Sequence, residues 1–232
     1  MTAVPVVAAA NAAGTALPPQ IVYRPQDDTA LLIDALDEVE LAGRRVLDLC
    51  TGSGAVAAAA AARGAHRLVA VDTCPHATAA AGTLRPPSSR WSAVQSTVAS
   101  FTDPDGFDLI TCNPPYVPAP ADDHLPRVPG PAHAWNAGPD GREVLDVLCT
   151  RAADLLRGPG ALLLVQSALA DPVRTTEMLS DSGFHVTEVR RRRIGFGPVL
   201  RSRREWLVDR ELLAPHEDSE TLVVLLARKE HR

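Results

Sequence analysis

Val46-Leu47-Asp48-Leu49-Cys50-Thr51-Gly52-Ser53-Gly54 is an apolar run that passes directly into a turn of small residues. The run predicts a strand that is covered on both faces, and the alanines that follow predict a helix. Glycines let a backbone turn tightly and approach a ligand, and the helix N-terminus offers free N–H groups. A second apolar run ends at Asp72, where an acid can reach the hydroxyls of a ribose. This stretch therefore predicts a nucleoside pocket at the edge of a parallel sheet.

The rest of the chain continues the alternation of strands and helices. Apolar runs predict strands at 45–49, 67–71, 93–95, 107–111, 161–165 and 222–226. Helical patterns lie at 28–40, 54–63, 76–84, 141–156 and 172–182, and Asp171-Pro172 supplies a cap and a first-turn proline for the last of them. This order predicts an α/β fold with a doubly wound, mostly parallel sheet and helices on both faces.

The composition is that of one globular protein domain. The chain has 232 residues, of which 46% are hydrophobic and 22% charged, and its formal net charge is -5. We expect a single domain over residues 21–232, preceded by a disordered or extended tail over residues 1–20. The tail lacks the basic region of a signal peptide, and it is too short to span a membrane. Four widely spaced cysteines form no metal-binding motif and fit reduced thiols in the cytoplasm.

Asp48 indicates which nucleoside cofactor the predicted pocket binds. A nicotinamide-binding domain carries G-x-G-x-x-G after its first strand, whereas this chain has Gly52, Gly54 and then Ala57. A carboxylate at the end of the strand repels a pyrophosphate but accepts hydrogen bonds from the amino group of a methionine moiety. The turn therefore favours S-adenosylmethionine as cofactor, and a tight turn without any ligand is the alternative.

A second motif, Asn113-Pro114-Pro115-Tyr116, follows the strand predicted at 107–111, at the sheet edge where ligands bind. The lone pair of an amide or exocyclic amino nitrogen is delocalised, so its N–H groups must be held while the lone pair points at the methyl group. The Asn113 side-chain oxygen and the Pro114 carbonyl can accept those two N–H groups. The prolines stiffen the backbone, and Tyr116 can stack on the flat group. The motif predicts methyl transfer to a planar nitrogen, with a plain proline turn as the alternative.

With these motifs the chain resembles the HemK-type glutamine N5-methyltransferases that modify peptide-chain release factors, in their short form without a helical N-terminal domain. Residues 22–29 (Val-Tyr-Arg-Pro-Gln-Asp-Asp-Thr) are similar to the family's segment ahead of the first helix. Residues 47–54 and 113–117 are similar to its cofactor and substrate motifs. Residues 134–144 (Ala-Trp-Asn-Ala-Gly-Pro-Asp-Gly-Arg-Glu-Val) are similar to its glycine-rich helix lead-in, which points to the release-factor group more narrowly.

The resemblance implies a Rossmann-like class I methyltransferase with a seven-stranded sheet whose last strand is antiparallel. It also implies S-adenosylmethionine as donor, S-adenosylhomocysteine as product and a glutamine side chain of a release factor as acceptor. Cys50 departs from the family by replacing the first glycine of the turn. Ser96-Thr97 stand where the family offers an acid to adenine.

Each residue of the expected site has one or more expected roles. We expect catalysis by Asn113, Pro114 and Tyr116. We expect substrate binding by Asn113, Pro114, Pro115, Tyr116 and Trp135, and no metal. We expect cofactor binding by Thr29, Asp48, Cys50, Thr51, Gly52, Gly54, Asp72, Thr73, Thr97 and Asn113.

Two stretches do not follow the alternation of strands and helices, and several functions other than glutamine methylation are also considered. The proline-rich residues 114–139 are expected to face the substrate. Residues 190–219 are expected as an insertion, and their seven arginines from Arg190 to Arg204 suit either a nucleic-acid contact or a solvated basic hairpin. An RNA or DNA amino-methyltransferase, a small-molecule N-methyltransferase and a non-catalytic binding subunit are alternatives to the protein-modifying enzyme. The sequence leaves open whether an activating partner subunit is needed.

Overall fold

The computed structural model describes residues 22–86, 90–121 and 131–229, and the tail expected over residues 1–20 lies outside them. Seven strands of the described residues form one sheet in the order β3-β2-β1-β4-β5-β7-β6. Strands β3 to β5 in that order run parallel, whereas β7 pairs antiparallel with both β5 and β6. The strands are β1 (Arg45–Leu49), β2 (Arg67–Asp72), β3 (Arg90–Gln95), β4 (Phe107–Cys112), β5 (Leu156–Ser167), β6 (Phe184–Gly195) and β7 (Ser219–Lys229).

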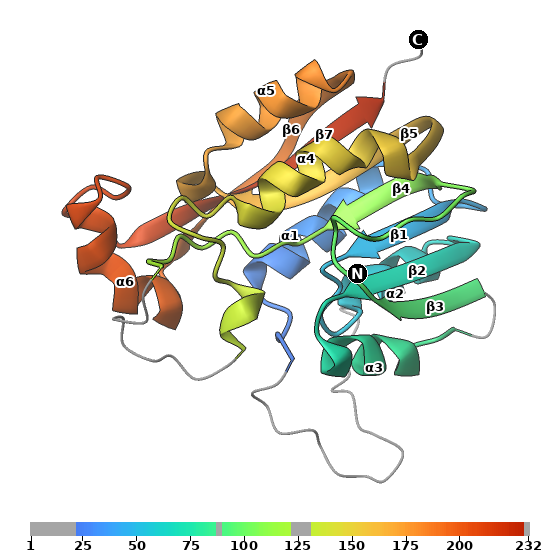
Figure 1. Ribbon diagram of the computed structural model, residues 1–232, viewed down its shortest axis with the longest axis horizontal. Helices are drawn as coiled ribbons and strands as arrows, with labels where there is room; N and C mark the ends of the chain where they lie inside the picture. The colour runs from blue at the N-terminus through green and yellow to red at the C-terminus, as the bar shows by residue number, and fades with distance from the viewer. Residues whose placement is uncertain (1–21, 87–89, 122–130, 230–232) are drawn as a thin grey trace, which may run out of the picture.

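Helices cover both faces of this sheet (Figure 1). The helices α4 and α5 lie in front of the sheet in this view, and α1 and α2 lie behind it. Helix α6 extends beyond the ends of β6 and β7. The α-helices are α1 (Asp27–Ala35), α2 (Ala55–Ala62), α3 (Pro75–Thr83), α4 (Glu143–Leu155), α5 (Pro172–Asp181) and α6 (Pro198–Asp209), with 3₁₀ turns η1 (Leu36–Glu38), η2 (Ala132–Ala134) and η3 (Ala168–Ala170).

The central strands are buried because helices cover both of their faces. In β1 the last four residues are buried, and β5 and β7 each bury a continuous apolar run. Leu162 to Val165 of β5 are fully buried between β4 and β7. The predicted doubly wound sheet is confirmed, as is the antiparallel last strand.

The strand β6 and the helix α6 are the elements that the sequence pattern did not predict. β6 is an edge strand with little burial, so its arginines hide the alternation of apolar and polar residues that marks a strand. Pro198 occupies the first turn of α6, where its missing N–H costs nothing. The expected insertion at 190–219 therefore begins within the edge strand β6. The hairpin expected there is present as the antiparallel pairing of β6 with β7, but the expectation missed the helix α6 between the two strands.

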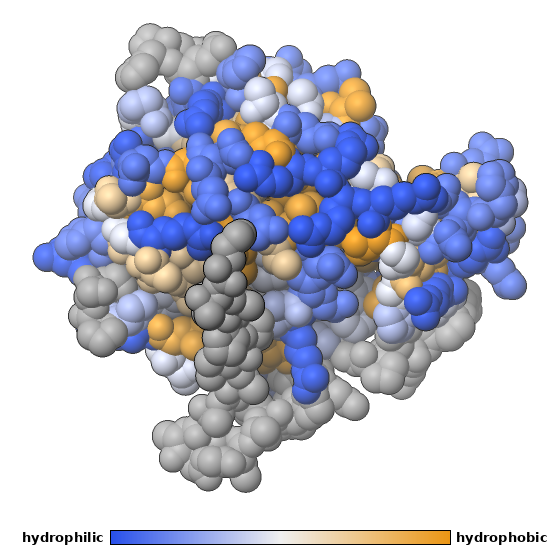
Figure 2. Space-filling view, turned by 180° about the vertical axis from the view of Figure 1, so that it is seen from behind, coloured by the Kyte–Doolittle hydropathy of each residue, from blue (hydrophilic) through white to orange (hydrophobic). Residues whose placement is uncertain are grey.

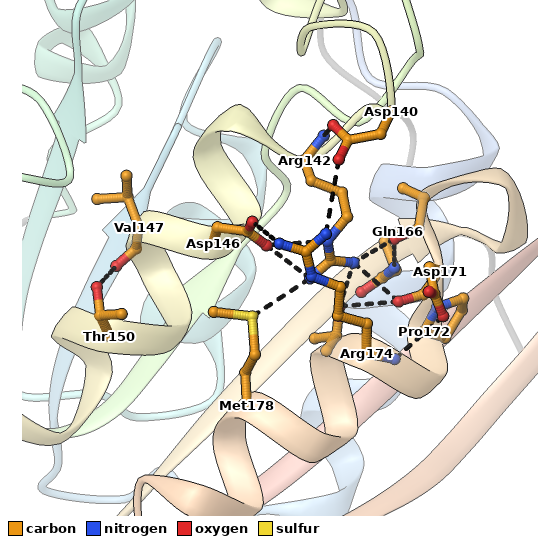
Figure 3. Close-up of polar contacts among 12 residues, drawn as sticks. Asp140, Arg142, Asp146, Val147, Thr150, Gln166, Asp171, Pro172, Arg174 and Met178 are labelled. Atoms are coloured by element: carbon orange, nitrogen blue, oxygen red, sulfur yellow. Dashed lines mark hydrogen bonds and ion pairs between the residues drawn. The ribbon is translucent and has the colours of Figure 1, made fainter.

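The joint between α4 and α5 is built around the buried side chain of Arg142 (Figure 3). Its guanidinium donates to the carbonyls of Ala170 and Asp171 and to the Thr175 hydroxyl. It also forms an ion pair with Asp146 at 2.8 Å. Arg142 belongs to the glycine-rich segment at 134–144, so part of that segment's role is to connect helices rather than to bind substrate.

The surface on the side of α1 and α2 is mainly hydrophilic, with apolar residues in scattered patches (Figure 2). Among the described residues, Val173 is the one large apolar side chain that is mostly exposed. Within the same residues, no helix combines the length and the apolar character that crossing a bilayer requires.

Candidate active site

A cavity of about 620 Å³ opens at the carboxyl ends of β1, β2, β3 and β4. The start of α1, the segment 133–136 and the start of α6 also line it, together with residues of α2, α3, α4 and β7. The sheet order brings these strand ends together, because β2 and β3 are added on one side of β1 and β4 is then added, parallel, on the other side. The predicted site residues that line it are Thr29, Asp48, Cys50, Thr51, Gly52, Asp72, Thr73, Thr97, Asn113, Pro114, Pro115, Tyr116 and Trp135.

The turn after β1 forms one wall of the cavity. Cys50 has a φ of 55°, Gly52 a φ of 54° and Gly54 a φ of 85°, so all three lie in the left-handed region. A side chain at φ > 0 costs about 1–2 kcal/mol, which explains why a glycine suits position 50 better than a cysteine. Asp72 braces the turn, because its carboxylate accepts the N–H of Gly52 at 2.8 Å and the N–H of Cys74 at 2.9 Å.

Gly54 has a structural role that differs from the one expected. It caps the start of α2 and does not line the cavity. A Cβ at this position would lie 3.0 Å from the Cα of Ala81 in α3. Gly54 thus permits close packing of two helices behind the turn.

Asp48 is a fully buried carboxylate at the end of β1. Desolvation by burial raises its pKa to about 6. Hydrogen bonds from the Thr111 hydroxyl at 2.6 Å and the Thr51 hydroxyl at 2.5 Å oppose this rise without cancelling it. The backbone N–H of Ala57 is a third donor to Asp48, and a carboxylate accepts about four hydrogen bonds, so Asp48 can still accept an N–H from an ammonium group in the cavity.

This pKa leads to a pH-dependent affinity for S-adenosylhomocysteine. Asp48 is ionised above pH 6 and gains a proton below it, so the carboxylate that attracts an ammonium group is lost as the pH falls. We expect the affinity to be constant above pH 7 and to fall by up to about tenfold per pH unit below pH 6. Calorimetry from pH 5 to pH 8 measures this.

Two variants test the assignment to Asp48. Asp48→Asn is expected to bind weakly at pH 8 with a flat pH profile. Asp154→Asn, which alters an exposed carboxylate of α4, is expected to keep the wild-type profile. An affinity of the wild type that is equal at pH 5 and pH 8 would contradict the role of Asp48.

Asn113 follows β4 and reaches across the cavity to α1. Its side-chain nitrogen donates to the Thr29 hydroxyl at 3.2 Å. An amide whose nitrogen is held in this way keeps its oxygen as the free acceptor. The arrangement supports the predicted use of the Asn113 oxygen to hold an N–H group.

Below Asn113, Cys112 is fully buried at the end of β4. Burial raises the pKa of its thiol well above its usual value, and a hydrogen bond with Cys50 raises it further. None of the four cysteines, all of which lie within the described residues, forms a disulfide. The described residues contain no group of histidine, cysteine and carboxylate side chains that could hold a metal ion.

Tyr116 contacts a carboxylate that the sequence analysis did not assign to the site. Its ring is buried, and its hydroxyl donates to Asp28 at 3.1 Å. The Tyr23 hydroxyl donates to the same oxygen at 2.8 Å. Burial raises the pKa of both tyrosines, and the charges of Asp28 and Glu220 raise it further. Both phenols therefore stay protonated and act as donors.

Glu220 is a second acid that the sequence did not reveal. It lies in β7 and lines the cavity, and its Oε2 is buried without a hydrogen-bond partner among the described residues. Burial raises its pKa, a hydrogen bond from Ser167 lowers it, and the nearby Asp28 raises it. A single acid in a strand carries no sequence signal, because only the fold brings it beside Asp28.

The chain after the Asn-Pro-Pro-Tyr motif is held in place by the segment at 134–144. Val117 and Asn136 form a parallel bridge, and the Val117 N–H donates to the Trp135 carbonyl at 2.9 Å. A Cβ at Gly141 would lie 2.4 Å from the Tyr116 carbonyl oxygen, so only glycine fits there. The two segments that resemble the same family are therefore packed against each other beside the cavity.

Helix α6 secures this pair of segments through Arg203. The Arg203 guanidinium is buried and donates to the Pro118 carbonyl at 2.8 Å and to the Asn136 side chain. Burial lowers its pKa to about 10. Arg203 is thus a structural arginine and does not offer a charge to nucleic acid.

The arginines of β6 are compensated by acids. The ion pairs are Arg190–Glu38 at 2.5 Å, Arg191–Glu188 at 2.5 Å, Arg192–Asp34 at 3.2 Å and Arg193–Glu217 at 2.5 Å. Arg204 donates to the carbonyls of Pro215 and Glu217. These pairs neutralise most of the expected basic patch, so it gives no support to a nucleic-acid substrate.

Comparisons with known proteins agree with the geometry. Residues 24–124 match the family described as Methyltransferase small domain. Mouse Methyltransferase HEMK2 is 32% identical over 183 residues, which cover 75% of this chain and 85% of that protein. The Release factor glutamine methyltransferase of Mycolicibacterium smegmatis is 32% identical over 177 residues, which cover 70% of this chain and 59% of that enzyme.

The Mtq2 protein of E. cuniculi, solved in complex with Trm112, has the same fold. Its TM-score is 0.62 at 22% identity, over 90% of this chain and 99% of that chain. The fold and the cavity define a class I methyltransferase that uses S-adenosylmethionine. The chain belongs to the HemK-type methyltransferase family.

The residues present fit this cofactor. Asp48 faces the cavity beside the turn, where it can accept the ammonium group of the methionine moiety. Asp72 and Thr73 lie at the end of β2 and suit the ribose. Thr97 and Ser96 offer hydroxyl groups on the side where the family carries an acid for adenine.

Proposed function

We propose that this enzyme transfers a methyl group to the side-chain amide nitrogen of a glutamine in a protein, with the Gly-Gly-Gln loop of a peptide-chain release factor as the favoured substrate. The observation that carries this proposal is the orientation of Asn113. Its nitrogen is occupied by Thr29, which leaves its oxygen to accept one N–H of a primary amide. The Pro114 carbonyl, next along a stiff backbone, accepts the other.

The roles of this chain's residues follow from that arrangement. S-adenosylmethionine supplies an electrophilic methyl group. Asn113 and Pro114 hold the two amide N–H groups so that the nitrogen lone pair points at that group. The amide proton becomes acidic once the nitrogen is methylated, so no strong base is needed at this position. Trp135 and Tyr116 are proposed to flank the flat amide, since both line the cavity.

The names of relatives support a protein acceptor. The Mycolicibacterium smegmatis relative is a release factor glutamine methyltransferase, and the Mtq2–Trm112 complex is responsible for methylation of the eRF1 translation termination factor. A partner subunit is part of the proposal because Mtq2 was solved with one. A substrate of the translation machinery also agrees with the predicted cytoplasmic location.

A labelling experiment tests the acceptor class. The purified protein is incubated with S-adenosylmethionine labelled in its methyl group and with cell extract, which supplies both acceptors and partners. We expect label that protease removes and nuclease does not, at the glutamine of a Gly-Gly-Gln peptide after digestion. Label that survives protease but not nuclease would instead establish a nucleic-acid acceptor, and label in the low-mass fraction alone would establish a small molecule.

A further inference from the structure

Asp28 is the centre of a hydrogen-bond network that reaches Asn113. It is 5% exposed at the start of α1. Its Oδ2 accepts from the hydroxyls of Tyr23 and Tyr116, and its Oδ1 accepts from the Thr29 N–H at 2.6 Å and the Thr29 hydroxyl at 3.2 Å. In all four of these hydrogen bonds the Asp28 oxygens act as acceptors.

The charge of Asp28 sets the direction of the hydrogen bonds beyond it. The Thr29 hydroxyl has one proton, and that proton is given to Asp28. The same hydroxyl can then only accept from its other neighbour, which is Asn113 at 3.2 Å. The Asn113 amide must therefore turn its nitrogen toward Thr29 and its oxygen away from it.

We propose that Asp28 is a positioning residue, which acts through Thr29 to hold the Asn113 amide with its oxygen free to accept an N–H of the substrate. The reversed amide would present N–H groups to the N–H groups of the acceptor, and the two would repel each other. The orientation of the Asn113 amide follows from these hydrogen bonds alone. Its use in binding a glutamine amide rests on the proposed function.

The two tyrosines determine which oxygen of Asp28 is left for Thr29. Tyr23 and Tyr116 occupy the second oxygen of Asp28, so the first oxygen is left to Thr29. Tyr116 belongs to the substrate motif, 88 residues along the chain from Asp28. One carboxylate thus connects the first helix to both polar side chains of the Asn-Pro-Pro-Tyr motif.

Kinetics of matched variants test the proposal on the acceptor that the wild type methylates. Asp28→Asn and Thr29→Val are each expected to lower kcat at least about tenfold, and Asp28→Asn leaves the KM for S-adenosylmethionine within about twofold. Thr29→Ser, which keeps the hydroxyl, restores most of the rate. Asp27→Asn is the control, because Asp27 is exposed on the same helical turn and does not line the cavity.

A double variant separates positioning from simple loss of packing. Asp28 and Thr29 act on Asn113 through the same series of hydrogen bonds. The double variant Asp28→Asn with Thr29→Val is therefore expected to lose no more kcat than the worse single variant. Losses that multiply, or an Asp28→Asn variant whose kcat equals that of Asp27→Asn, overturn the proposal.

A measurement without any acceptor keeps this proposal separate from the proposed function. The side-chain amide resonances of Asn113 are observed in ¹⁵N-labelled protein and assigned by their disappearance in Asn113→Ala. We expect them to shift in Asp28→Asn and Thr29→Val but not in Asp27→Asn. Unshifted resonances contradict the role of Asp28. Shifted resonances in a protein that methylates no glutamine support Asp28 and overturn the acceptor instead.

Discussion

Asn113→Ala is expected to lower turnover at least about 100-fold while the affinity for S-adenosylhomocysteine changes by less than about threefold. Among the described residues no donor binds the Asn113 oxygen, since Thr29 binds the nitrogen, so the truncation breaks no hydrogen bond of that oxygen there. Its hydrogen bond to the acceptor matters most when the nitrogen attacks, so the loss falls on the transition state. Single-turnover rates and calorimetry with S-adenosylhomocysteine measure the two quantities.

Asn136→Ala serves as the comparison for this variant. Asn136 lies on the same cavity wall, but Arg203 already occupies its side-chain oxygen. We expect a loss of turnover below about tenfold. If Asn113→Ala lowered cofactor affinity as much as turnover, Asn113 would be a structural residue and the proposed holding of the amide would be wrong.

Arg142→Met is expected to lower the free energy of unfolding by about 3–5 kcal/mol. The side chain is 2% exposed, and its removal breaks the ion pair with Asp146 and takes one donor each from the carbonyls of Ala170 and Asp171. Gln166 and Thr175 still donate to those carbonyls, but methionine replaces none of the bonds that Arg142 makes. Denaturant unfolding followed by circular dichroism measures the change.

Arg174→Met is a close control for Arg142→Met, because both arginines bind Asp146 (Figure 3). The Arg174 side chain is 47% exposed, so water can replace its contacts. We expect a loss below about 1 kcal/mol. Equal losses for the two variants would show that the bonds of Arg142 to η3 and α5 contribute little to stability.

The parts of the site that lie within one stretch of sequence could be predicted. The turn after β1 and the motif after β4 each place a strand, a turn and their polar groups within ten residues, so local patterns suffice. The sheet order then brings Asp48 and Asn113 to the same edge. This is why nearly all expected residues line one cavity.

The parts that depend on distant contacts could not be predicted. Asp28 is an acid in the first turn of a helix, which normally indicates capping, and only its contact with Tyr116 reveals another role. Arg203 stands in an arginine-rich stretch that suggested a solvated surface, yet it is buried against Pro118, 85 residues away. The arginines of β6 gave a misleading signal for the same reason, because their acidic partners lie mostly on other elements.

The position of β7 also affects the order in which the sheet can form during synthesis. Its residues 219–229 are synthesised after β6, yet they lie between β5 and β6 in the sheet. During synthesis β6 therefore has no strand to pair with until the ribosome has released β7. The backbone N–H and C=O groups of β5 along this edge likewise stay unpaired until β7 is available. Completion of the sheet, and with it the placement of Glu220 beside Asp28, is thus a late event in the folding of the nascent chain.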